Sequence, residues 1–220
     1  GSSPSPSLPT RKAGAPIPLS RAQQRLWLQE QGAAPSARYN MAGAVDLRGK
    51  LDRVALERAL GALVTRHEIL RTTFHESTGP HAAVQVVGPV PETVLEILEA
   101  TSSLGYGGRA DADHTVLRRE LLSIAMVPME LDRGPLARFL LLELGPDHFG
   151  LLLVIHHILG DGWSFGILAS ELSSLYSGDS ELEPLPMQFA DYAAVDAQLS
   201  LDQAQLAAWL ANLAGSAALN

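Results

Sequence analysis

Two apolar segments separated by a short turn constrain the fold of this chain more than any other feature. Residues 136–144 and 149–155 are dominated by leucine, valine, isoleucine and phenylalanine, and Gly145-Pro146-Asp147-His148 lies between them. Glycine, proline and aspartate are residues that tight turns favour, so the pattern predicts a β-hairpin. The stretch 151–155 is wholly apolar, which is typical of a strand that is buried on both faces.

The other segments alternate between helical and extended patterns. Ser20 and Gln23 have the spacing of a capping box, which predicts a helix over 20–31. Asp52 precedes a helix whose apolar stripe contains Leu56, Leu60, Leu63 and Val64. Further helices are expected at 113–125, 164–176, 187–198 and 201–213, and further strands at 42–47, 69–75, 83–87 and 94–98. Because helices and hairpins are mixed along the chain, we expect an α+β fold, a mixed β-sheet with helices packed on it.

Length and composition exclude several classes of protein. The 220 residues suit one domain or one lobe of a larger one. A net charge of −8 without a basic stripe argues against a nucleic-acid partner. No apolar stretch approaches the roughly 20 residues that span a bilayer, so no membrane partner is expected. The absence of cysteine excludes disulfides, thiolate metal sites and cysteine nucleophiles, and it fits a reducing, cytoplasmic location.

The strongest candidate site follows the strand expected at 151–155. His156 and His157 end that strand, and Gly160-Asp161-Gly162 turns the chain and brings a carboxylate back toward them. An imidazole at the mouth of a buried strand can serve as a general base, although a lone histidine there is more often a hydrogen-bonded structural residue. Neighbouring side chains on a strand point to opposite faces, so one histidine should face the core and the other a cleft. Alternation alone leaves open which is which.

Two other types of site fit the sequence less well. Two histidines on opposite faces cannot readily bind one ion, so no metal site is expected. Residues 162–166 match G-x-S-x-G, which would make Ser164 a hydrolase nucleophile. In that fold the catalytic histidine follows the serine, whereas all 7 histidines of this chain precede Ser164. Ser164 is therefore expected to be the N-cap of the helix over 164–176.

A second polar cluster lies where a helix is expected to run into a strand. It consists of Arg66-His67-Glu68 and Arg71. Cations are favourable at a helix C-terminus for purely structural reasons. The functional alternative is that one arginine crosses the fold, pairs with Asp161 and braces the turn beneath the imidazole. Removing one partner of such a buried pair would cost about 3–5 kcal/mol.

Three segments of the chain resemble motifs of the condensation domains of nonribosomal peptide synthetases, whose fold is that of chloramphenicol acetyltransferase. Residues 20–27 are similar to Ser-x-Ala-Gln-x-Arg-Leu-Trp, residues 66–74 to Arg-His-Glu-x-Leu-Arg-Thr-x-Phe, and residues 156–162 to His-His-x-x-x-Asp-Gly. They occur in the family's order across most of the chain. The family's full domain has two lobes, and the sequence has no counterpart of the second. The resemblance therefore implies an N-terminal lobe.

The resemblance implies a reaction and a catalytic residue. An aminoacyl amine would attack an upstream acyl or peptidyl thioester and form an amide bond. His157 would be catalytic, either accepting the proton of the amine or orienting that amine and stabilising the tetrahedral intermediate. His156 would be structural. Gly162 would bring a backbone N–H close to the reacting carbonyl.

The remaining site residues follow from the same resemblance. Asp161 would be structural and salt-bridged to an arginine, with Arg71 favoured over Arg66. Two residues are expected to line the substrate tunnel, namely Trp163 and Ser164. The substrates would be carried on phosphopantetheine arms of partner domains, so no tightly bound cofactor is expected.

The resemblance also implies boundaries and partners. The composition of residues 1–18 indicates a tag remnant and interdomain linker, and the resemblance implies that 19–215 are the N-terminal lobe and 216–220 the tail where the absent C-terminal lobe would begin. The expected partners are that lobe, the upstream and downstream peptidyl carrier domains, and an adjacent adenylation domain. By itself the lobe should be inactive. The alternatives are an epimerisation domain of the same family and a non-catalytic, condensation-like recruitment module.

Overall fold

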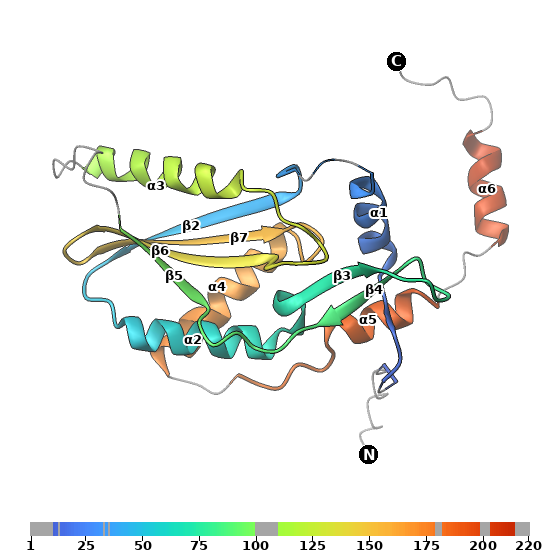
Figure 1. Cartoon of the computed structure of the whole chain (residues 1–220), viewed down its shortest axis with the longest axis horizontal. Helices are drawn as coiled ribbons and strands as arrows, with labels where there is room; N and C mark the ends of the chain where they lie inside the picture. Colours follow the sequence, from blue (N-terminus) through green and yellow to red (C-terminus); the bar gives the residue numbers. More distant parts are fainter. Residues whose placement is uncertain are drawn as a thin grey trace.

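A computed structural model describes residues 11–12, 14–32, 34, 36–99, 110–178, 182–198 and 203–213 of the chain. Within these residues the strands form a four-stranded sheet in the order β2-β7-β6-β5 and a three-stranded sheet in the order β1-β4-β3. Helices cover both faces of the larger sheet (Figure 1). The expected mixed sheet with packed helices, an α+β fold, is therefore confirmed.

The larger sheet contains the predicted hairpin. Strands β6 (Ala137–Gly145) and β7 (His148–His156) pair antiparallel, and the turn between them contains Asp147, whose φ is +54°. Aspartate is one of the few residues with a side chain that tolerates this left-handed conformation. On the outer side of β7 lies β2 (Asn40–Arg48), also antiparallel, whereas β5 (Leu95–Glu99) pairs parallel with β6.

Alternate side chains of the hairpin enter two separate cores. Leu140, Leu152 and Val154 pack in a cluster with Trp27 and Phe74. The other cluster combines side chains of β6 and β7 with apolar side chains of two helices: Phe139, Leu141, Leu151, Leu56, Leu60, Leu63 and Leu168. The prediction that the segment 151–155 is buried on both faces is confirmed for four of its residues, while Leu153 is only half-buried.

Two layers of helices produce these cores. On one face α3 (Ala110–Ala125) contacts β2, β6 and β7, and on the other α2 (Arg53–Arg66) packs against α4 (Gly162–Ser177) (Figure 1). Helix α2 begins at the predicted cap, Asp52, and all four residues of its expected stripe are buried. The last two helices are α5 (Phe189–Asp196) and α6 (Gln203–Leu213).

The smaller sheet corrects one predicted strand. The expected strand over 69–75 begins only at Thr72, because Glu68–Arg71 form a 3₁₀ turn, η1, ahead of β3 (Thr72–Glu76). This turn carries the chain from α2 into the sheet and buries Leu70. The predicted hairpin partner, β4 (Ala83–Val87), pairs antiparallel with β3.

The segment ahead of residue 19 contributes to the same sheet. Strand β1 (Ile17–Pro18) pairs antiparallel with β4. Upstream of it, Arg11 donates to both carboxylate oxygens of Glu68 at 2.6 and 3.0 Å. Residues that the sequence places in a linker are thus joined to the fold by strand pairing and by an ion pair.

Helix α1 (Arg21–Glu30) carries the first motif. Its predicted capping box is present, with the Ser20 hydroxyl accepting from the Gln23 N–H. Arg21 donates from its backbone and its guanidinium to Asp196 of α5, at 2.7 to 3.0 Å. These hydrogen bonds from Arg21 lower the pKa of Asp196, and the ion pair holds α1 against α5.

Candidate active site

The end of β7 fixes the backbone of the two histidines. The N–H of His156 donates to the Leu136 carbonyl at 2.9 Å, and the N–H of His157 donates to the Tyr39 carbonyl at 2.7 Å. The strand end is thus held from both neighbouring segments, and the two rings point to opposite sides. His156 is fully buried, with 0 % of its surface exposed, whereas His157 is exposed. The structure therefore shows that His156 is the histidine facing the core and that His157 is the one facing outward.

The buried ring of His156 is a neutral, two-sided hydrogen-bonding group. Its Nδ1 accepts from the backbone N–H of Ile158 at 3.1 Å, and its Nε2 lies 3.2 Å from Oε1 of Glu30. Because a backbone N–H can only donate, Nδ1 carries the lone pair and the proton is on Nε2. Burial lowers the pKa of His156, outweighing the opposite effect of Glu30. The ring therefore acts as a fixed structural element.

The exposed ring of His157 has the opposite tautomer. Its Nδ1 lies 2.7 Å from the carbonyl oxygen of Gly160. Because a carbonyl can only accept, Nδ1 is the donor and the lone pair of the neutral ring is on Nε2. A histidine whose Nδ1 is held by a carbonyl in this way has its Nε2 available to receive a proton.

The ring of His157 lines a pocket of about 550 Å³ to which all three motifs contribute. The first motif supplies Ala22, Gln23, Arg25 and Leu26, the second supplies His67, Ile69 and Leu70, and the third supplies residues 157–161. Gln23 also joins the first motif to the third directly, because its Nε2 donates to the Ile158 carbonyl at 3.2 Å. Segments that are far apart in the sequence therefore surround one accessible imidazole.

The predicted ion pair of Asp161 with Arg71 or Arg66 is wrong. Asp161 is instead the N-cap of α4, and its Oδ1 accepts from the backbone N–H of Ser164 at 3.2 Å. The Ser164 hydroxyl lies 3.2 Å from the same oxygen and accepts from the Asp161 N–H at 3.1 Å, which completes a capping box. The hydrogen bond from the Ser164 backbone is the main reason that the pKa of Asp161 is lowered. Asp161 therefore has a structural role, as predicted, but it acts as the N-cap of α4 and not as the partner of an arginine.

Both candidate arginines have other partners. Arg71 donates through Nη1 to the Gly88 carbonyl, at the end of β4. Arg66 donates through Nε to Glu171 of α4 at 3.1 Å, and the same carboxylate oxygen lies 2.6 Å from Nε2 of His67. The Arg66 cluster therefore ties α2 to α4. His67 also lines the pocket. The sequence indicated His67 only as part of the second motif and did not predict this position.

The two tunnel candidates and Gly162 occupy the first turn of α4. Ser164 lines the pocket, whereas Trp163 does not and has 82 % of its surface exposed. The expectation that Ser164 is the N-cap is wrong by three residues, since Asp161 is the cap and Ser164 is at N3. Gly162 is the first helical residue, where a backbone N–H has no intrahelical acceptor.

Ser164→Ala should leave activity within a few fold of wild type, because the hydroxyl serves the cap of α4. In the described structure its hydrogen bonds are with Asp161 and none is with an imidazole. Losing them should reduce the free energy of unfolding by about 1 kcal/mol, the net contribution of a typical hydrogen bond. Turnover of the complete domain and urea denaturation would measure the two effects. Abolished turnover with an intact fold would restore Ser164 as a nucleophile.

The described residues contain no group of three or more histidine, aspartate or glutamate side chains placed to hold a metal ion. Within the same part of the chain, no helix has both the length and the apolar character that crossing a membrane requires.

Comparisons with known proteins bear on this site. A family model described as "Condensation domain" matches residues 15–219. One of the polypeptides of the linear gramicidin synthase of Brevibacillus parabrevis is 38 % identical over 208 residues, covering 91 % of this chain and 3 % of that polypeptide. Cyclosporin synthetase simA of Tolypocladium inflatum is 37 % identical over 220 residues, covering 98 % of this chain and 1 % of the synthetase.

Solved structures show the same fold. The starter condensation domain of rhizomide synthetase RzmA is 25 % identical with a TM-score of 0.75, and the match covers 93 % of this chain and 49 % of that one. The X-domain in a complex with OxyB from teicoplanin biosynthesis is 28 % identical with a TM-score of 0.76, covering 99 % of this chain and 47 % of that one. The chain thus spans about half the length of the solved domains and a small part of the curated synthetases.

Proposed function

Because the chain belongs to the condensation-domain family of nonribosomal peptide synthetases, we propose that it supplies the catalytic histidine for amide-bond formation. The donor is an acyl or peptidyl thioester on one carrier domain, and the acceptor is an aminoacyl amine on another. One observation carries the proposal. His157 is the exposed member of the pair, and its Nδ1 is bound to the Gly160 carbonyl in the pocket where the three motifs meet.

In the proposed reaction the acceptor nitrogen attacks the thioester carbonyl carbon. The C–N bond forms, a proton of the amine passes to Nε2 of His157, and the C–S bond breaks to release a thiolate, which takes that proton from His157 and leaves as the thiol. Gly162, at the start of α4, would present its backbone N–H to the developing oxyanion. A thioester is already activated, so holding the two tethered ends together can supply about 7–11 kcal/mol of the barrier reduction.

The pocket is compatible with substrates on phosphopantetheine arms. About 550 Å³ suffices for a small acyl group and part of an arm, and the lining includes many apolar side chains: Leu26, Ile69, Leu70, Ile155, Ile158, Leu159, Ile167, Leu168, Leu185, Met187 and Phe189. We propose upstream and downstream peptidyl carrier domains and an adjacent adenylation domain as partners.

We further propose that this chain is the N-terminal lobe of a two-lobed domain, corresponding to residues 19–215. Its match to about half of a solved condensation domain supports this assignment. Trp163 and Ile167, on the first two turns of α4, are 82 % and 45 % exposed. An absent C-terminal lobe lying over these side chains would close the second wall of the tunnel.

A two-carrier condensation assay tests this proposal. The complete domain, given one loaded donor carrier and one loaded acceptor carrier, should form the amide, whereas the 220-residue chain alone should form none above the uncatalysed rate. Mass spectrometry of the carrier-bound product would measure both. Amide formation by the isolated chain would contradict the half-tunnel hypothesis. Failure of the complete domain with several matched substrate pairs would contradict the catalytic assignment.

The second candidate function is recruitment of a protein partner. The solved X-domain, which matches 99 % of this chain, is described in a complex with OxyB. A condensation-like recruitment module would bind its partner yet fail the two-carrier assay. An epimerisation domain would instead invert the stereocentre of a carrier-bound residue without forming an amide.

A further inference from the structure

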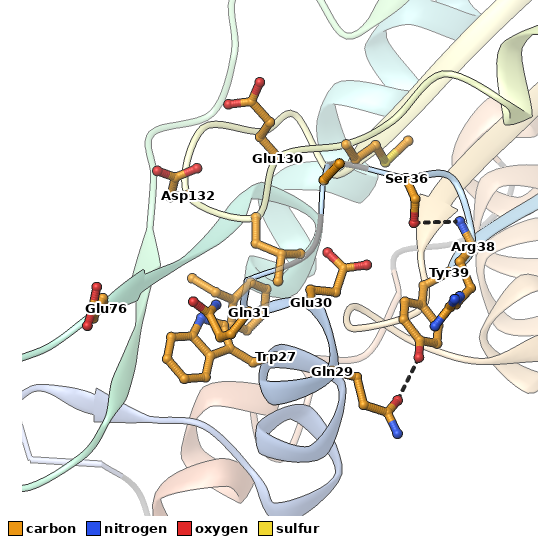
Figure 2. A pocket seen from close by; sticks show the side chains of 14 residues that line it. Trp27, Gln29, Glu30, Gln31, Ser36, Arg38, Tyr39, Glu76, Glu130 and Asp132 are labelled. Atoms are coloured by element: carbon orange, nitrogen blue, oxygen red, sulfur yellow. Dashed lines mark hydrogen bonds between the residues drawn. The ribbon is translucent and has the colours of Figure 1, made fainter.

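Glu30 connects the buried histidine to a second pocket. This pocket, of about 490 Å³, is lined by Glu30, Trp27, Tyr39 and Glu130 among others, and Figure 2 shows the Glu30 side chain lying between Trp27 and Tyr39. Glu30 is the last residue of α1, and only 15 % of its side chain is exposed. Its Oε1 lies 3.2 Å from Nε2 of His156.

The hydrogen bonds around His156 require one tautomer. Nδ1 must accept because its partner is the N–H of Ile158, so the proton of the neutral ring is on Nε2 and points to Glu30. Without an acceptor at Glu30, this fully buried N–H would lose the hydrogen bond that it makes in the described structure. A buried donor without an acceptor is costly, and moving the proton to Nδ1 would instead displace the Ile158 N–H.

The same ring holds the turn that positions His157. Besides the Ile158 contact, the Leu159 N–H donates to the His156 carbonyl at 2.9 Å, and the turn ends at Gly160, whose carbonyl holds Nδ1 of His157. Tyr39 restrains His156 from the side, with ring centroids 6.0 Å apart and an interplanar angle of 63°. We therefore expect a change in the His156 ring to reach the His157 imidazole through the backbone of residues 158–160.

We propose that Glu30 is a positioning residue for His157 and acts through the tautomer of His156. The required property is a hydrogen-bond acceptor at the reach of a glutamate side chain, and negative charge is not required. The catalytic consequence rests on the proposed function, whereas the effect on the two imidazoles does not.

Two substitutions of Glu30 distinguish the effect of side-chain length from the effect of negative charge. Glu30→Gln keeps an acceptor oxygen at the same distance and should preserve the His156 and His157 tautomers. Glu30→Asp keeps the charge, but its carboxylate is one methylene short, so it should change the ring ¹⁵N shifts of both histidines. Nitrogen-15 NMR of histidine-labelled chain measures this without any catalysis. Glu76→Asp is a matched control, because Glu76 lines the same pocket and the described hydrogen bonds of the His156 ring are to Glu30 and Ile158.

Turnover of the complete domain provides the second measurement. Glu30→Asp should lower kcat by about tenfold with little change in KM, consistent with the loss of one buried hydrogen bond, and Glu30→Gln should stay within about threefold of wild type. Unchanged histidine shifts in Glu30→Asp, or changed shifts in Glu30→Gln, would overturn the proposal. If the wild-type domain does not turn over while the shifts respond as expected, the proposed function fails and the positioning role of Glu30 stands.

Discussion

Replacing His157 with alanine in the complete domain should lower kcat for amide formation by about 10²–10⁴-fold, the range for loss of a positioned general base. The ring is exposed, and its side chain is hydrogen-bonded to the Gly160 carbonyl. That carbonyl belongs to a residue that is only partly buried, and it can be hydrated in the variant. The free energy of unfolding should therefore stay within about 0.5 kcal/mol of wild type.

The measurement combines the two-carrier assay with urea denaturation of the same variant. Ser164→Ala is the matched control for turnover, because Ser164 lines the same pocket and is assigned no chemical role. Turnover of His157→Ala within tenfold of wild type would contradict the proton-accepting role. A large loss of stability in this variant would show that the ring supports the fold and that the kinetic effect is indirect.

His156→Ala, one residue earlier, should act mainly on stability and reduce the free energy of unfolding by about 4 kcal/mol. The ring has 0 % of its surface exposed, so truncation leaves a cavity in addition to the lost contacts. It also removes the acceptor of the Ile158 N–H and the donor to Glu30, which leaves a largely buried carboxylate without that partner. We expect poor solubility at 37 °C to accompany this loss.

His156→Asn separates the two contributions to that loss. The asparagine Oδ1 can occupy the place of Nδ1 and accept from the Ile158 N–H, so this variant should recover part of the stability that alanine loses. Urea denaturation of the 220-residue chain measures all three proteins without a substrate. If the His156→Ala and His156→Asn variants were equally stable, the hydrogen bond from the Ile158 N–H would contribute little to the free energy of unfolding. Wild-type stability of His156→Ala would contradict the structural role altogether.

The errors of sequence reasoning at this site have a common physical origin. The expected pairing of Asp161 with Arg71 rests on residue types, because a lone carboxylate near an active-site turn needs a cation or donors. Ser164, three residues away, already supplies those donors through its backbone N–H and its hydroxyl, and such a local hydrogen bond orders little additional chain. Arg71 meanwhile donates to the Gly88 carbonyl, just after β4, a segment that becomes its neighbour only after folding.

Sequence patterns predicted the elements whose signals are local. The capping box at Ser20, the stripe of α2 and the hairpin turn at Asp147 all depend on residues within a few positions of one another. By contrast, the 3₁₀ turn at Glu68–Arg71 has no distinct local signature, because its apolar residues also fit a strand. The contact of Glu30 with His156 joins residues that are 126 positions apart, so no local pattern could reveal it.

Short-range patterns in the chain were sufficient for the α+β class and for the buried hairpin, because periodicity and turn chemistry act over few residues, whereas the three motifs were identified by their resemblance to a known family. The family resemblance indicated that His157 is the histidine facing the pocket, whereas the packing that directs it there, and the tautomer of each ring, arise only in the folded chain. Those properties depend on Tyr39, Leu136, Glu30 and Gly160, whose hydrogen-bonding groups reach the imidazole pair only in the folded chain. Alternation along a strand determines that neighbouring side chains point to opposite faces. Packing of other segments against the strand determines which of the two faces is buried.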